Sequence, residues 1–185
     1  MKHTIAVFAV VALLGAWRLQ AQDAPASAGA PAEECLSRLK QLQLALSLYQ
    51  KDYDERLPPA DKWSDALALY TKGSPGEKRG AEQIAAFHCP LLGQGGWGYS
   101  MNWKLSKRRL AEVEAPAGTV ALYETNVPRP NANYDGRDLM LRHAMPGAAG
   151  KSEVGGNFAF ADGHVGWLSA AQRPNFRIFL NNKPR

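Results

Sequence analysis

The spacing of hydrophobic residues predicts a long helix near the start of the chain. From Glu33 onward, apolar side chains recur at steps of four and three, which places them on one helical face. Pro31 and the acidic Glu33 and Glu34 suit its first turn, and Leu57-Pro58-Pro59 ends it. We expect this face to pack on a sheet, although it could instead bind a partner; its members are Cys35, Leu39, Leu42, Leu46, Tyr49 and Tyr53.

The middle of the chain predicts one shorter helix and several strands. The helix runs from Lys62 to Lys72, with Asp61 as its N-cap and Gly73 ending it. Strands are expected at 98–102 and 119–124, and 139–143 is a candidate for another. Proline and asparagine make residues 126–137 a long irregular connection.

The strongest β signal lies between Gly155 and Leu168. Its centre, Asp162-Gly163, favours a two-residue type I′ turn, so we expect a hairpin in which Phe160 faces Val165. Side chains alternate along a strand, which puts Phe158, Phe160, Val165 and Trp167 on one face and Ala159, Ala161, His164 and Gly166 on the other. The predicted fold is therefore α+β, with one long N-terminal helix laid across an antiparallel sheet of about four strands.

The first residues have the pattern of a signal peptide. Lys2 precedes an apolar run, residues 5–17, and Leu19-Gln20-Ala21 offers a cleavage site. The run is shorter than the roughly 20 residues of a membrane-spanning helix, but the size of Leu19 leaves an uncleaved anchor open. We expect residues 1–21 to be a signal peptide, 22–32 an Ala/Pro-rich linker and 33–185 the globular domain. The mature protein would then be extracytoplasmic, and it would be membrane-bound only if the leader is not cleaved.

Composition and charge narrow the class of protein. Hydrophobic residues make up 45% and charged residues 21% of the chain, as in ordinary globular domains. The formal net charge is +5, of which Lys2 and Arg18 of the leader supply two. The remaining charge is too small to predict binding of nucleic acid.

Two cysteines in an exported chain favour a disulfide. Cys35 and Cys89 are the only cysteines of the sequence. Closing a loop of about 54 residues would stabilise the fold by about 4 kcal/mol on the chain-entropy model. The alternatives are two buried free thiols, or a cytoplasmic protein with no true leader.

Residues near the C-terminus resemble a known bacterial motif. Arg142-His143, Gly155-Gly156, Asn157, Phe160 and Asp162-Gly163-His164 fit the pattern Arg-His-x-Gly-Gly-x-Asn-x-x-Phe-x-Asp-Gly-His. This resembles the H-X(9)-DG domain of pseudopilin-like proteins that carry a prepilin-type processing-associated segment and are related to type II secretion and type IV pilins. The run from Cys35 to Tyr49 is also similar to that family. The segment 144–154 is longer than the family's spacer.

The resemblance implies a pilin-like fold and a non-enzymatic, exported binding or accessory protein. The partner would be an unknown protein, with secretion or cell-envelope components as candidates, and no cofactor or metal is expected. The family's processed N-terminal segment is not recognisable here, and Pro25 and Pro31 would break a helix continuing from the leader. Filament assembly by the family's usual route is therefore not expected.

Two other functions stay open. A secreted hydrolase could use His143, Asp162 and His164 as an acid–base group, and a binding module could hold calcium with Asp135, Asp138 or Asp162. Neither His-x-x-x-His nor Cys-x-x-Cys occurs, so these histidines and His88 lack the spacing of a zinc site. The turn alone explains Asp162-Gly163.

Overall fold

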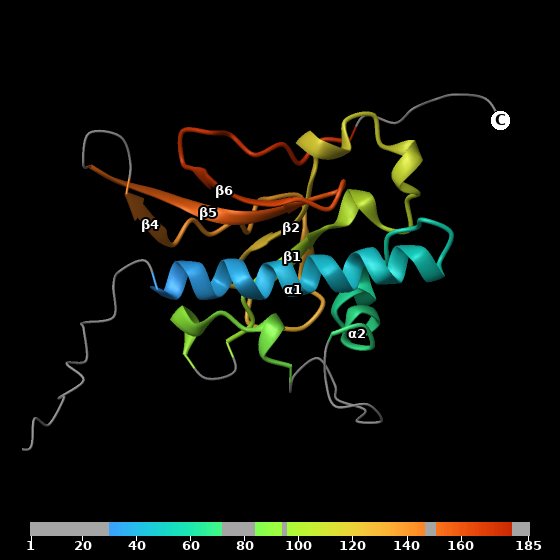
Figure 1. Cartoon of the computed structure of the whole chain (residues 1–185), viewed down its shortest axis with the longest axis horizontal. Coiled ribbons are helices and arrows are strands. Elements are labelled where there is room, and N and C mark those ends of the chain that lie inside the picture. The colour runs from blue at the N-terminus through green and yellow to red at the C-terminus, as the bar shows by residue number, and fades with distance from the viewer. Residues whose placement is uncertain (1–29, 72–83, 94–95, 147–150, 179–185) are drawn as a thin grey trace, which may run out of the picture.

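One long helix lies along one face of a six-stranded sheet in this computed structural model (Figure 1). The structure describes residues 30–71, 84–93, 96–146 and 151–178. The helix is α1 (Ala30–Asp52), and the strands are β1 (Tyr99–Asn102), β2 (Val120–Glu124), β3 (Asn133–Tyr134), β4 (His143–Pro146), β5 (Ser152–Phe160) and β6 (Val165–Ser169). The predicted α+β class is confirmed.

The sheet is mixed rather than antiparallel. Its order is β3-β1-β2-β5-β4, with β6 paired to β5. β1 and β3 run parallel, and the other pairs are antiparallel. Gly155 of β5 has partners in both β4 and β6, so β6 lies on the opposite side of β5 from β4. Among the residues described, β6 is thus an outer strand.

The helix α1 begins and ends earlier than expected. It starts at Ala30, so the last residues of the predicted linker are helical, while 22–29 lie outside the described residues. Pro31 fits because a first-turn proline lacks only an N–H that has no helical partner. Asp54 and Glu55, both with positive φ, follow the helix end, and the Glu55 N–H reaches the carbonyl of Gln50 at 2.8 Å. The left-handed backbone, rather than the prolines, ends the helix.

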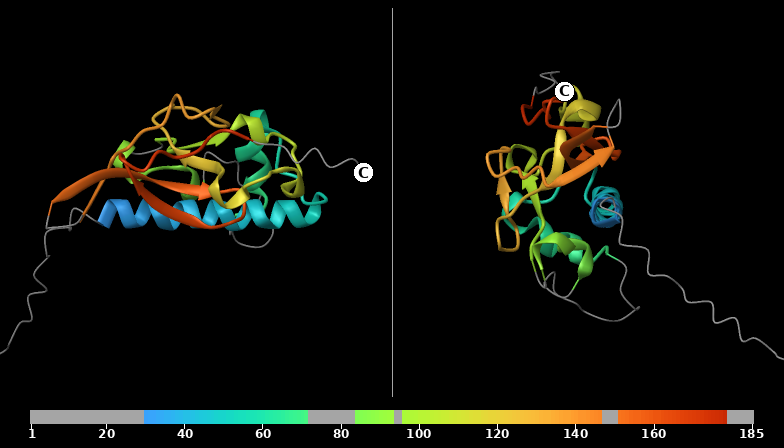
Figure 2. Two further views of the ribbon diagram at one scale, coloured as in Figure 1. Left: turned by 90° about the horizontal axis from the view of Figure 1, so that it is seen from above. Right: turned by 90° about the vertical axis from the view of Figure 1, so that its left-hand side faces the viewer.

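The stripe of α1 packs as predicted, with one exception. Leu39, Leu42 and Leu46 are at most 1% exposed and lie in a core between α1 and the sheet. Tyr53 is 49% exposed, and its ring stacks on that of Tyr49 at 4.2 Å between centroids. α1 and β5 run beside each other along the length of the molecule (Figure 2).

The β5–β6 pair has a different register from the predicted hairpin. Val165 faces Ala159, not Phe160, and the N–H of Phe160 donates to the carbonyl of His164 at 2.9 Å. Residues 161–163 therefore form a three-residue turn in which Gly163 has a φ of +105°. Glycine supplies the single positive φ that such a turn requires.

The shift of one residue exchanges the faces of three side chains, those of His164, Val165 and Trp167, and Trp167 now faces Asn157. Val165 joins the core beneath α1, together with Ala159. His164 instead stacks on Phe160, with ring centroids 4.1 Å apart. Phe160 belongs to a second core on the far face of the sheet, formed by Val120, Tyr123, Phe158 and Phe160 with Leu139, Leu141, Leu168 and Phe176 around them.

The segment 144–154, which is longer than the family's spacer, joins the sheet at its two ends, while residues 147–150 lie outside the described residues. Ala144 pairs with Val154 and Met145 with Glu153, which extends β5 to nine residues. The candidate strand at 139–143 begins only at His143, and the connection 126–137 contains β3. Strands β1 and β2 lie within the stretches predicted for them.

The shorter helix differs most from its prediction. α2 covers only Trp63–Ala68 after a 3₁₀ turn, so Asp61 is not its N-cap. Asn131, in a left-handed conformation, accepts hydrogen bonds from the backbone N–H and the hydroxyl of Ser64, both at 2.8 Å. A side chain from a distant loop thus caps the helix.

No helix within the described part of the chain is long and apolar enough to span a membrane. The predicted signal peptide, residues 1–21, lies outside this part.

Replacing Asn131 should destabilise the protein through α2. Asn131→Gly keeps the left-handed backbone but leaves the N–H and hydroxyl of Ser64 without an acceptor, so we expect a loss of about 1–3 kcal/mol. Urea unfolding followed by circular dichroism measures it. Asn126→Ala, at an exposed site in the same connection, should change stability by less than about 0.5 kcal/mol. Equal values for both variants would contradict the capping role.

Candidate functional site

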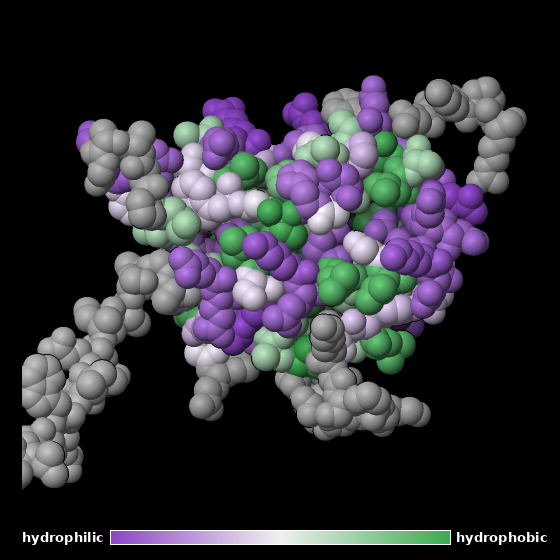
Figure 3. All heavy atoms as spheres, in the orientation of Figure 1, coloured by the Kyte–Doolittle hydropathy of each residue, from purple (hydrophilic) through white to green (hydrophobic). Residues whose placement is uncertain are grey.

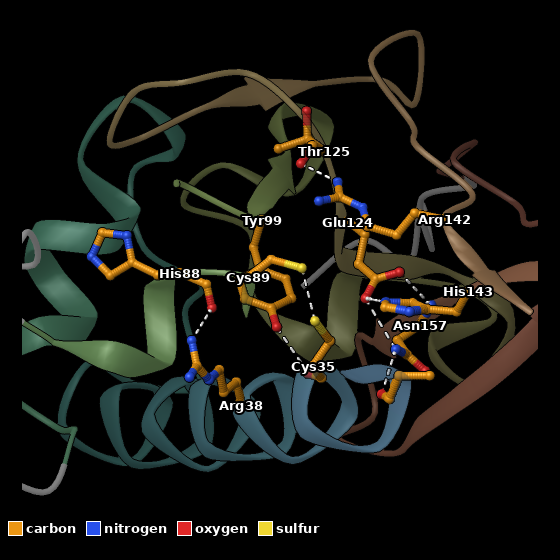
Figure 4. A network of polar contacts seen from close by, with 11 residues as sticks. Cys35, Arg38, His88, Cys89, Tyr99, Glu124, Thr125, Arg142, His143 and Asn157 are labelled. Atoms are coloured by element: carbon orange, nitrogen blue, oxygen red, sulfur yellow. Dashed lines mark hydrogen bonds and ion pairs between the residues drawn. The ribbon is translucent and has the colours of Figure 1, made fainter. Parts of the chain in front are cut away.

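A buried carboxylate joins the strands that carry His143, Gly155, Gly156 and Asn157, four residues of the predicted motif. Glu124, the last residue of β2, is 0% exposed. Its Oε1 lies 2.6 Å from Nε2 of His143 and accepts from Nδ2 of Asn157 at 3.0 Å, while its Oε2 accepts from the Asn157 N–H at 3.0 Å (Figure 4). One side chain therefore holds β2, β4 and β5 together.

The same cluster reaches α1. Nδ2 of Asn157 also donates to the carbonyl of Ala32 at 3.4 Å, in the first turn of the helix. Arg142 lies beside Glu124 in Figure 4 and donates to the carbonyl of Thr125. A buried carboxylate is tolerated only when it is hydrogen-bonded, and His143 and Asn157 meet that condition for Glu124. The buried Nε and Nη1 of Arg142 make no hydrogen bond within the described structure.

The structure brings the two cysteines together. Cys35 of α1 and Cys89, just before a 3₁₀ turn, are both 0% exposed, with their sulfur atoms 2.8 Å apart. Tyr99 donates its hydroxyl hydrogen to the carbonyl of Cys35 at 2.8 Å. The structure holds two separate thiols, so the disulfide stays a prediction, but its partners are already in contact.

The pKa values of the two thiols are displaced in opposite directions. The hydrogen bond between the two sulfur atoms lowers the pKa of Cys89, and a backbone N–H of the following turn and Arg142 act in the same direction. The same hydrogen bond and burial raise the pKa of Cys35. The two thiols therefore differ in acidity, and the thiolate is the form that attacks in disulfide chemistry.

His143 lies next to the cysteines, a proximity that the sequence did not predict. One donor atom each of Cys35, Cys89 and His143 lie within 4.8 Å of one another. A structural zinc site uses four ligands, and this group supplies three from the described residues. His143 already uses Nε2 for Glu124.

The two motif glycines allow close packing in this region. A Cβ on Gly155 would lie 2.2 Å from the carbonyl oxygen of Leu168 and 2.4 Å from the Trp167 ring. A Cβ on Gly156 would lie 3.3 Å from Oε2 of Glu124. A larger residue would separate β5 from β6 or disturb the carboxylate.

The remaining motif residues lie at the other end of β5. Asp162 accepts from the N–H of His164, and its Oδ1 lies 2.7 Å from the imidazole Nδ1, both side chains being partly exposed. His143 faces Gly155, about 20 Å along the strand from this turn. The structure therefore does not bring His143, Asp162 and His164 into one catalytic group.

Other candidate residues have local roles. Both oxygens of Asp138 accept from hydroxyls, those of Tyr123 and Thr125, and Asp135 forms an ion pair with Arg137. The ring of His88 packs near that of Trp97, with centroids 5.0 Å apart. These contacts account for the acidic residues considered for calcium without assigning them a ligand.

Sequence reasoning missed Glu124, the centre of the cluster. It was visible only as the end of an apolar strand, residues 119–124. An acidic residue closing such a strand is the one available signal, because a charge next to buried residues needs partners.

Comparisons with models of protein families, with curated proteins and with solved structures found no match to this chain. The family resemblance therefore stays a prediction.

Removing the carboxylate should unfold much of the protein. Glu124→Leu leaves His143 and the Asn157 N–H without their acceptor in a buried place and leaves Nδ2 of Asn157 with the Ala32 carbonyl alone, so we expect a loss of about 3–5 kcal/mol. Chemical denaturation measures it, with Glu153→Leu, at an exposed position of β5, as the matched control. Similar small losses in both variants would show that the cluster does not hold the fold together.

Proposed function

We propose that this protein is an exported, non-enzymatic, pseudopilin-like domain that acts by binding a partner protein in the cell envelope or outside the cell. The observation that carries the proposal is the use of the motif. His143 and Asn157 bind the Glu124 carboxylate, Asn157 also binds the first turn of α1, and Gly155 and Gly156 allow close packing beside them. Motif residues that stabilise the fold, rather than line a reaction site, are typical of a protein that acts by presenting a binding surface.

The arrangement of α1 supports a pilin-like fold. A single helix of 23 residues lies along the sheet, and its first turns meet β5 through Asn157 and Ala32. Its stripe is buried in the core, so any partner would bind its other face.

The cysteine pair supports export. Its sulfur atoms are in contact and the pair is fully buried, so a disulfide formed there in an oxidising compartment would be protected from reductants in solution. A structural disulfide of this kind would be rare in the cytosol of a mesophile.

The intact mass of the protein purified from its native host tests export. We expect a mass lacking residues 1–21, with both thiols blocked to alkylation until the protein is reduced and unfolded. Alkylating the unfolded protein without reductant controls for burial, because burial alone would also protect free thiols.

Two results would contradict the proposal. A full-length protein in the soluble cytoplasmic fraction, with both thiols alkylated after unfolding alone, would exclude an exported domain. A full-length protein in the membrane fraction would instead make the leader an anchor, and the protein a tethered accessory subunit.

A further inference from the structure

A hollow opens between the middle of α1 and the beginning of β6. Its volume is about 270 Å³, and it is lined by Lys40, Gln43, Leu44, Ser47, Gly163 and Val165. Its floor is the turn that contains the Asp162-Gly163-His164 part of the motif. The buried cluster at Glu124 does not extend to it.

The side chain of Gln43 has no partner within the described structure. It is 3% exposed, and neither its Oε1 nor its Nε2 makes a hydrogen bond there. A Cβ built on Gly163 would lie 3.7 Å from this Nε2 and 3.9 Å from Oγ of Ser47, so both groups face the space above the glycine. Leaving a buried amide unpaired destabilises a fold, and a bound ligand that pairs with the amide would recover that cost.

A peptide group of a ligand could supply both hydrogen bonds that the Gln43 side chain lacks. Its C=O would accept from Nε2 of Gln43, and its N–H would donate to Oε1. The hollow begins at β6, the outer strand, whose outward backbone groups can pair with an added extended segment. Two residues further along β6, on the face that looks toward α1, the buried Nε1 of Trp167 is likewise without a partner within the described structure.

The surroundings indicate which side chains such a segment would carry. Leu44 and Leu48, one turn apart on α1, are 53% and 37% exposed, and Figure 3 shows hydrophobic surface over this part of the helix. Lys40 borders the hollow and has no ion pair among the described residues, so it can receive a carboxylate.

We propose that the groove between α1 and β6 binds an extended peptide segment of a partner protein, with a peptide group paired to Gln43, apolar side chains on Leu44 and an acidic side chain at Lys40. The inference rests on the proposed binding function and names its surface. Gly163 keeps the groove open because any side chain there would enter it.

Selection from a random dodecapeptide library displayed on phage tests the proposal on the purified protein. We expect enriched peptides that combine apolar and acidic residues. A synthetic copy of an enriched peptide should bind Gln43→Leu at least about tenfold more weakly than it binds the unchanged protein, as measured by calorimetry. The melting temperature of this variant should be equal or higher, because the unpaired amide is gone. Gln41→Leu, an exposed site on the same helix, is the matched control and should bind normally.

A second variant checks the charge. Lys40→Glu should enrich basic in place of acidic residues in the same selection.

Four results would overturn the proposal. One is the absence of any enriched peptide. Another is equal binding to Gln43→Leu, which would place the site elsewhere and leave the binding function intact. A lower melting temperature of Gln43→Leu would show that an ordered water satisfies the amide as part of the fold. Self-association that Gln43→Leu abolishes would make a second copy of the chain the occupant.

Discussion

The fold depends on one carboxylate that is buried without contact with water. Glu124 gathers hydrogen bonds from two strands, and through Asn157 its cluster reaches the first turn of α1. Because a buried charge is stable only with all its partners present, these elements must assemble together rather than one at a time. The helix, β2, β4 and β5 therefore form one cooperative unit, and the cysteine pair next to it fixes the same end of α1 to the loop at Cys89.

The two ends of β5 serve different purposes. At one end, glycines and buried polar side chains pack closely around Glu124. At the other, the turn leaves space, and a buried amide lacks a partner. A single sequence motif that spans both ends thus combines a structural part with a part that faces the surroundings. This division explains why its two histidines, His143 and His164, do not act together.

Local patterns predicted the parts of the fold that local physics controls. The stripe of α1 and strands β1 and β2 follow from periodicity and from β-branched or aromatic residues. The register at Gly163 was wrong by one residue, because Asp-Gly fits both a two-residue turn and a three-residue turn with a bulge. Non-local features could not be predicted from the sequence. The cap from Asn131 to Ser64 and the parallel pair β1–β3 join residues far apart in the chain, and no periodic pattern of residues marks such contacts. For the site, the sequence indicated the motif residues and the cysteine pair, but nothing in it predicted that Glu124 binds His143 and Asn157.

The bond between Asn157 and Ala32 spans 125 residues of the chain. During synthesis the first helix is made long before the strand that holds it, so a partial chain cannot complete its core and stays open until its C-terminal strands exist. Such a late closure slows folding, since long loops must be ordered before their contacts form. In the proposed exported protein, the order of these contacts along the sequence would postpone folding until the whole chain is available.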